Sequence, residues 1–309
     1  MKRPLALLAL LAASPLPAQS ADAPYTVRER GQAFSTLQEA VNAIGDGRGT
    51  IVVAPGTWRD CAVQNGGQIT FTAADPGTAA FDGGACEGKA TLVLRGRGAT
   101  IEGLIFQNIR VPDANGAGIR LEKGDLTVRE SLFRDSESGI LSANDPSGTI
   151  TVERSTFSGL GRCDRDLACA HSIYIGDYGH LIVRRSRFER GAGGHYVKTR
   201  SARIQVTDSS FDDSAGHTTN FMIDLSAGAT GTIARNTFVQ GKDKENYSAM
   251  IVVAAEGKAN SANGLTLAAN DASLAPGARP TTFVVDFSGV SIQADGNRLT
   301  AKIAKFERR

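Results

Sequence analysis

Six polar side chains, drawn from three short apolar segments, have the types and spacing needed for acid–base chemistry. Each segment carries an apolar residue at the same place, and we expect Ile173, Val197 and Ile223 to point inward. Their polar neighbours should then point outward on one face, where parallel strands about 5 Å apart would bring them together. The candidate site residues are His171, Tyr174, His195, Lys198, Arg200 and Asp224.

Such a patch suits β-elimination from a uronic acid. That reaction needs a cation to neutralise the C6 carboxylate, a base to remove the C5 proton, and an acid to protonate the leaving glycosidic oxygen. Arg200 is always charged and suits the first role. Lys198, flanked by cations, is predicted to have a lowered pKa and to be the base. Tyr174 or His195 would be the acid, and C5 epimerisation begins with the same steps.

An alternative interpretation gives these residues no catalytic role. Lys198 and Arg200 would be solvated charges on an outer face, and Tyr174 would stack against a neighbouring coil. Asp224 is as readily a salt-bridge partner of Lys198 as a catalytic group or a calcium ligand. His171 is a corner residue, as is His195, so the sequence leaves open which of the two faces the patch.

A recurring sequence pattern sets the spacing of these segments. Apolar and polar residues alternate and end on a phenylalanine, as in residues 126–133 and 204–211. Successive phenylalanines are 27, 24, 31, 23 and 27 residues apart, a period typical of solenoids. We expect their rings to stack inside the molecule as an aromatic ladder. The six phenylalanines are Phe106, Phe133, Phe157, Phe188, Phe211 and Phe238.

A second strand is predicted after each phenylalanine, and the candidate side chains belong to three of these strands. Residues 171–175, 195–198 and 221–225 would pair in parallel on successive coils. This pattern predicts an all-β, single-domain right-handed parallel β-helix. Residues 35–44 begin with Ser-Thr and carry apolar residues at helical spacing, which predicts a short helix that caps the N-terminal end. Beyond residue 257 the repeat is irregular, although residues 283–287 and 290–293 still have the pattern of strands.

Four cysteines predict two disulfides. Cys61 and Cys86 are one period apart, so stacked coils would bring them near the Cα separation of about 5.5 Å that a disulfide needs. Cys163 and Cys169 enclose a polar loop immediately before His171, which would either form one wall of a groove or stabilise an insertion. A zinc site would need closely spaced cysteines or neighbouring histidines, which Cys61 and Cys86 do not have.

The N-terminus has the features of a cleaved secretory signal. Basic residues precede the apolar run 5–13, and Ala18 and Ser20 would occupy positions −3 and −1 before the cleavage site. We therefore predict a signal peptide over residues 1–20, a β-helix domain over residues 21–309, and a periplasmic or secreted protein. Without the signal the formal charge falls from +2 to zero, which argues against nucleic acid as a partner.

Two stretches carry a resemblance to known families. TLQEAVNA at 36–43, followed by GTIVVAPGTW at 49–58, resembles the opening of pectin-lyase-like right-handed β-helix proteins. The resemblance implies the fold but no single activity, because that superfamily holds lyases, hydrolases, esterases, epimerases and non-catalytic adhesins. VKTRS at 197–201 is similar to the lysine-bearing coil of chondroitinase-B-like and alginate-lyase β-helices. Those enzymes place a catalytic arginine on the following coil, where this sequence has Asp224.

These features together predict a protein that acts on an anionic, uronic-acid-containing polysaccharide or oligosaccharide, with a β-eliminating lyase favoured. A non-catalytic glycan-binding or envelope structural β-helix and a C5-epimerase are the alternatives. We expect no cofactor and no bound metal, with calcium left open, no nucleic-acid partner, no membrane span and a monomer. A β-helix hydrolase would need paired outward carboxylates around the sugar bond, and the sequence does not offer that pattern.

Overall fold

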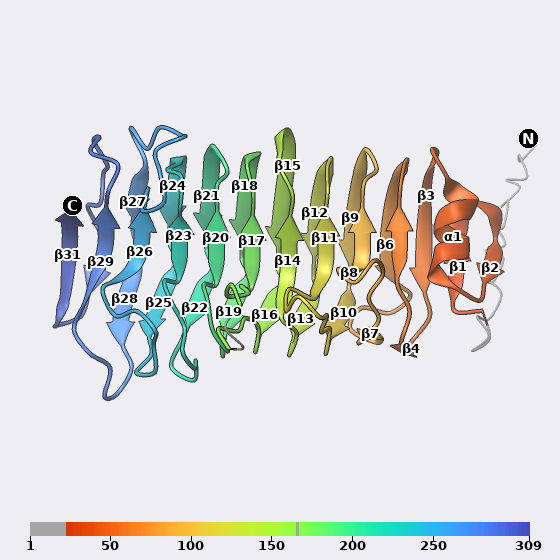
Figure 1. The fold of residues 1–309 in the computed structure, drawn as a ribbon, viewed down its shortest axis with the longest axis horizontal. Coiled ribbons are helices and arrows are strands. Elements are labelled where there is room, and N and C mark those ends of the chain that lie inside the picture. The colour runs from red at the N-terminus through yellow and green to blue at the C-terminus, as the bar shows by residue number, and fades with distance from the viewer. Residues whose placement is uncertain (1–22, 165–166) are drawn as a thin grey trace, which may run out of the picture.

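In the computed structural model the chain winds into an elongated solenoid (Figure 1). The structure describes residues 23–164 and 167–309, and the predicted signal peptide lies outside them. Three long sheets run along the solenoid, and within the described residues they contain eleven, ten and ten strands. Strands of successive coils pair in parallel, which is the architecture that the repeat predicts.

Each sheet takes its strands in turn from successive coils, starting at the N-terminal end. Sheet A contains β2 (Gln32–Phe34), β1 (Tyr25–Val27), β3 (Arg48–Val53), β6 (Gln68–Ala73), β9 (Gly98–Glu102), β12 (Asp125–Arg129), β15 (Asp145–Glu153), β18 (Tyr178–Arg184), β21 (Arg203–Thr207), β24 (Thr230–Ala234) and β27 (Thr266–Ala268). Sheet B contains β4 (Gly56–Trp58), β7 (Ala79–Asp82), β10 (Leu104–Gln107), β13 (Leu132–Arg134), β16 (Thr156–Ser158), β19 (Arg187–Glu189), β22 (Ser210–Asp212), β25 (Thr237–Gln240), β28 (Asp271–Leu274) and β30 (Arg298–Leu299). Sheet C contains β5 (Ala62–Gln64), β8 (Ala90–Leu94), β11 (Ala117–Leu121), β14 (Ser138–Ser142), β17 (Ile173–Ile175), β20 (Val197–Thr199), β23 (Ile223–Leu225), β26 (Ala249–Val253), β29 (Thr281–Asp286) and β31 (Ile303–Arg308).

The recurring sequence pattern forms two strands and a corner, where the sequence alone indicated one strand. In residues 126–133 the break falls at Glu130, whose φ of 49° lies in the left-handed region and turns the chain from sheet A into sheet B. The next residue, Ser131, is buried, and its backbone N–H donates to Oγ of Ser155 on the following coil (3.2 Å). A ladder of serine and asparagine side chains thus satisfies the buried backbone groups at this corner.

The interior contains the predicted aromatic ladder. The rings of Phe133 and Phe157 are stacked with their centroids 4.8 Å apart, and Phe157 and Phe188 follow at 4.9 Å. Phe81 extends the ladder toward the N-terminus, 5.6 Å from Phe106. One aromatic side chain per coil therefore fixes the register of the coils, because a slip of one residue would turn each ring outward.

A short helix closes the N-terminal end, as predicted. Helix α1 (Leu37–Ile44) begins with a capping box, in which Thr36 and Glu39 each accept a hydrogen bond from the backbone N–H of the other. The side-chain amide of Gln38 bonds both the N–H and the C=O of Val63, on the first strand of sheet C. The helix therefore covers a strand edge that would otherwise be free to pair with another chain. A 3₁₀ turn (Arg28–Arg30) and the antiparallel pair β1–β2 complete this end.

The C-terminal end departs from the prediction in one place. Strand β29 covers most of residues 283–287, as expected, but residues 290–293 form no strand and make only a single bridge, from Gln293 to Thr266. The reason is a tight turn: Ser288 donates its N–H to Asp286 Oδ1, and Gly289 has a φ of 76°. The chain is therefore bent at residues 288–290, and the pairing that remains is made by Gln293, which donates to Leu265 (2.9 Å) and accepts from Leu267 (2.7 Å).

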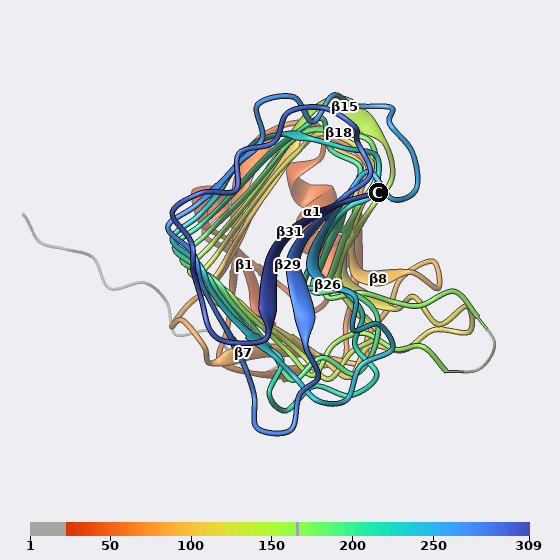
Figure 2. The ribbon, with the colours of Figure 1, turned by 90° about the vertical axis from the view of Figure 1, so that its left-hand side faces the viewer.

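Both predicted disulfides are present. Cys61 and Cys86 join stacked coils with their Cα atoms 5.5 Å apart, and Cys163 and Cys169 close the short loop. The view along the solenoid shows that the loops between sheet B and sheet C project from one side (Figure 2). Within residues 23–164 and 167–309, no helix has the length and apolar character needed to cross a membrane.

Candidate functional site

Three of the predicted side chains form one column on the outside of sheet C. The register places Tyr174 on β17 beside Lys198 on β20, and Lys198 beside Asp224 on β23. Their neighbours Ile173 and Val197 are fully buried and point into the core. The alternation of the strands thus brings the three polar groups together as the sequence predicts.

Lys198 lies at the centre of the patch and is held by two carboxylates. Its Nζ donates to Oδ2 of Asp224 (2.7 Å) and forms a second ion pair with Glu256. Burial disfavours the charged amine, but Asp224 and Glu256 outweigh this effect and raise the pKa of Lys198. The predicted lowering is therefore wrong, because the groups that contact Lys198 across the coils are anions. The two carboxylates thus favour the cationic form of Lys198, which has no electron pair with which to accept a proton.

Arg200 completes the cationic side of the patch. Its guanidinium donates to the Tyr174 hydroxyl and lies 5.3 Å from the centre of that ring. It also pairs with Glu256, whose two carboxylate oxygens contact Lys198 and Arg200, one each. Sequence reasoning missed Glu256, because it lies in the loop after β26, where the period of the repeat does not apply. Its backbone N–H donates to the carbonyl of Ser226 (2.9 Å), which fixes it beside the column.

Both histidines face the patch. The backbone N–H of His195 donates to Nδ1 of His171 (3.0 Å), so this nitrogen carries no proton. Nδ1 of His195 lies 3.2 Å from the same atom, and a hydrogen bond between the two nitrogens requires the His195 tautomer with its proton on Nδ1. In that tautomer Nε2 of His195 is unprotonated, and it faces Oδ2 of Asp224 at 3.5 Å. Burial lowers the pKa of His171 and of His195 well below the usual value, and neighbouring cations lower both further.

Within the described residues, only one of the two carboxylate oxygens of Asp224 accepts hydrogen bonds. Oδ2 accepts hydrogen bonds from Lys198 and from the Ser226 hydroxyl (2.9 Å). Oδ1 is buried and has no hydrogen-bond partner among the residues described. A buried acceptor without a donor is uncommon in native proteins. Asp224 therefore retains the capacity to accept one more hydrogen bond at the patch.

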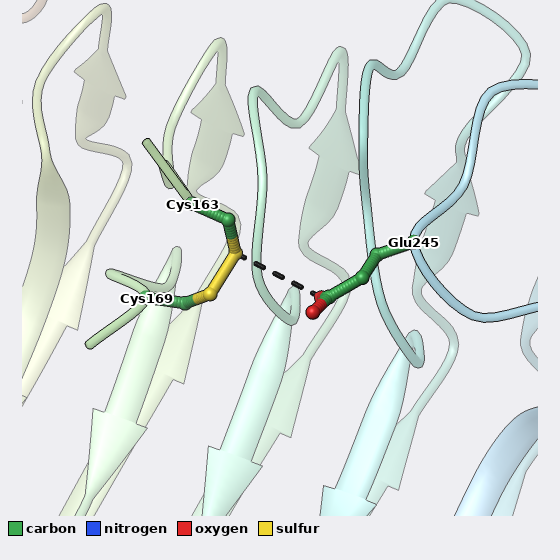
Figure 3. A group of neighbouring side chains, drawn as sticks. All are labelled: Cys163, Cys169 and Glu245. Carbon is green, nitrogen blue, oxygen red and sulfur yellow. Dashed lines mark hydrogen bonds between the residues drawn. A yellow bond between two sulfur atoms is a disulfide. The ribbon is translucent and has the colours of Figure 1, made fainter. Parts of the chain in front are cut away.

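The disulfide loop stands beside the histidines. Gly194 donates its N–H to Sγ of Cys163 (3.2 Å), and Glu245 approaches the same sulfur to 3.8 Å (Figure 3). Cys163, Cys169 and Glu245 are the one group of possible metal ligands in the described parts of the chain. The two sulfurs are bonded to each other, so neither is a thiolate that could bind zinc. Cys163 is thus held next to Gly194, the residue before His195, and its sulfur is not available as a zinc ligand.

A second ionic cluster lies beneath these loops, and no pattern in the sequence pointed to it. Lys244 and Asp213 are fully buried and form an ion pair of 2.9 Å. Asp213 also accepts hydrogen bonds from the Tyr196 hydroxyl (2.8 Å) and from Thr219 (2.8 Å). Burial lowers the pKa of Lys244, and the Asp213 charge offsets this only in part. Both ionic residues come from loops, whose register the repeat does not determine.

Comparison with known proteins agrees with this architecture. Residues 90–272 match the family described as "Right handed beta helix region", and the chain belongs to that family. No curated protein matches the sequence. Among solved structures, one match is titled "Structure of PL6 family alginate lyase AlyGC", at 14% identity and a TM-score of 0.49. The match covers 83% of this chain but only 40% of that one, and at this level it says nothing about the chemistry of the patch.

Proposed function

We propose that the patch binds the carboxylate of a uronic acid and that the protein is a β-eliminating lyase of an anionic polysaccharide. One observation carries the proposal. Lys198 and Arg200 hold a carboxylate, that of Glu256, between them beside the Tyr174 hydroxyl and Nε2 of His195. A uronate carboxylate in the same place would have its charge neutralised, which makes the C5 proton more acidic.

The roles follow from the protonation states. Nε2 of neutral His195 accepts the C5 proton, and Asp224 stabilises the imidazolium that forms. The electron pair of the C5–H bond becomes the C4–C5 double bond, and the C4–O bond breaks. Tyr174 gives its hydroxyl proton to the leaving oxygen and regains one from solvent, to which the His195 imidazolium releases the proton that it took from C5. Lys198 and Arg200 stay protonated throughout and carry the charge of the enolate-like intermediate.

A second candidate function is glycan binding without turnover. It is favoured by the charge balance of the patch, where two cations already face two carboxylates. Asp224 also occupies the place where the similar lyases have an arginine. A C5-epimerase is a variant of the first proposal, in which the proton returns to the opposite face of C5 and no bond to oxygen breaks.

The proposal includes a location and a partner. Two disulfides persist in oxidising compartments, which agrees with the signal peptide predicted over residues 1–20. We propose that the mature protein is periplasmic or secreted and acts as a monomer on an acidic polysaccharide. The turnover assay is run with added calcium and with a chelator, which tests whether the activity requires calcium.

The test is turnover by the purified mature chain on a panel of uronate polysaccharides. Elimination is followed by the ultraviolet absorbance of the 4,5-unsaturated uronate, and hydrolysis by reducing ends. We expect the wild type to produce absorbance and both Lys198→Ala and His195→Ala to lose it, while Lys305→Ala, an exposed lysine outside the patch, keeps it. Binding with no new absorbance and no new reducing ends would overturn the lyase and favour the binding protein. An inverted C5 centre without cleavage would identify the epimerase.

A further inference from the structure

We propose that Glu256 is a built-in competitor for the substrate carboxylate and thereby restricts the site to anionic ligands. The inference rests on the proposed function, because it names the group that a uronate must replace. Glu256 occupies the space between Lys198 and Arg200, where each of its oxygens meets one cation. A ligand carboxylate reaches this position only when Glu256 leaves it.

The two carboxylates of the patch differ in how firmly they are held. The Asp224 side chain is 3% exposed and also bonds Ser226, whereas the Glu256 side chain is 44% exposed. An ion pair with so exposed a partner contributes little to stability, since water solvates the carboxylate after separation. Asp224 is therefore a fixed part of the patch, and Glu256 is the exchangeable part.

The local backbone lets the Glu256 side chain leave without disturbing the solenoid. Residues 255–259 are all exposed. On either side the chain is anchored to the preceding coil, by the N–H of Ala254 to Leu225 (2.9 Å) and the N–H of Asn260 to Ala227 (2.9 Å). Rotation of this one exposed side chain thus vacates the position between Lys198 and Arg200, called the seat below, while both backbone hydrogen bonds stay in place.

The charge balance explains why only an anion would take the seat. With Glu256 in place, Lys198 and Arg200 are matched by two carboxylates. Departure of Glu256 leaves one positive charge without a partner next to a largely buried amine. A uronate restores the balance and a neutral sugar does not, so Glu256 rejects neutral sugars by staying in place.

The first experiment asks whether the seat accepts a free carboxylate, and it does not depend on any polysaccharide. Glu256→Ala is melted in sodium acetate and in acetamide, its neutral analogue, at constant ionic strength. We expect acetate to raise the Tm of the variant by about 2 °C when the seat is occupied, with no rise for acetamide. Wild type and Glu102→Ala, which breaks an exposed ion pair with Arg129 on sheet A, serve as controls. An equal response of all three proteins would overturn the inference.

The second experiment uses trimers of galacturonate, mannuronate and guluronate as ligands and titration calorimetry as the readout. We expect Glu256→Gln to bind any trimer that the wild type binds at least about 5-fold more tightly, since the competitor is removed. Weaker binding by Glu256→Gln would overturn the inference and make Glu256 a contact of the ligand. A Tm of Glu256→Ala that rises in acetate, together with no trimer binding by wild type or Glu256→Gln, would instead contradict the proposed function. Glu256 would then be the occupant of a general carboxylate site.

Discussion

Two lysine–aspartate pairs lie close together in this molecule and differ in what surrounds them. Lys244 and Asp213 are fully buried, and both oxygens of Asp213 accept hydrogen bonds from several donors. Lys198 and Asp224 lie on the outer face of sheet C and are largely buried, but one carboxylate oxygen has no partner among the described residues and the second partner of the lysine is an exposed glutamate. The pKa of Lys244 is lowered by burial, while the carboxylates beside Lys198 raise its pKa.

The difference separates a structural ion pair from a candidate functional one. A buried pair whose polar atoms are all satisfied has nothing left to bind, and it fixes the loops that contribute it. The Lys198–Asp224 pair keeps an unused acceptor and a replaceable partner, which are the properties that a ligand site needs. Residue type alone would not distinguish the two pairs.

The largest effect that this comparison predicts is on stability. Lys244→Met leaves the Asp213 charge buried with no cation, so we expect the free energy of unfolding to fall by about 3–5 kcal/mol. Lys198→Met should lower it by only about 1–2 kcal/mol, because the Ser226 hydroxyl still donates to Asp224 and His195, 3.5 Å from the carboxylate, can take up a proton in place of the lost cation. Urea denaturation of both variants measures the difference. Equal losses would contradict the distinction between the two pairs.

The next effect concerns the buried neutral histidines. His171 and His195 have lowered pKa values, so below about pH 6.5 the unfolded chain binds protons that the folded chain does not. Stability therefore falls as the pH falls through this range, by up to about 2–3 kcal/mol per pH unit for the two together. Urea denaturation at pH 7.5 and pH 5.5 measures the loss. His195→Gln should reduce the slope and His217→Gln, an exposed histidine, should not; a slope unchanged by His195→Gln would show that other groups cause it.

The smallest expected effect is the difference in stability between two tyrosine variants, one in each region. Tyr196→Phe removes a buried hydrogen bond to Asp213 and should lower the free energy of unfolding by about 1–2 kcal/mol. Tyr174→Phe removes a partly exposed hydroxyl and should change it by less than about 0.5 kcal/mol, while abolishing turnover. Denaturation of both variants tests the two stability changes, and the activity of Tyr174→Phe tests the expected loss of turnover. Full activity of Tyr174→Phe would remove Tyr174 from the acid role.

The sequence predicts the parts of this molecule that the period controls. Alternation and the phenylalanine spacing predict the coils, the ladder and the column of Tyr174, Lys198 and Asp224, because strand register carries each residue to its place. Glu256 and Lys244 escape prediction, since they come from loops after the strands, where no period applies. The predicted direction of the Lys198 pKa is wrong for a related reason. Its sequence neighbours are cations, whereas the groups that contact it are carboxylates from later coils.

The central claim is that neutral His195 removes a proton beside a carboxylate held by two permanent cations. The pH profile of kcat/KM on the uronate polysaccharide that the panel identifies tests it most directly. Because the pKa of His195 is lowered, we predict an acid limb below pH 6.5 and no further rise above pH 8. His195→Ala should abolish the rate at every pH. A rate that keeps rising above pH 8 would contradict the account and assign the base to an amine or a phenol, and binding without turnover at any pH would contradict catalysis altogether.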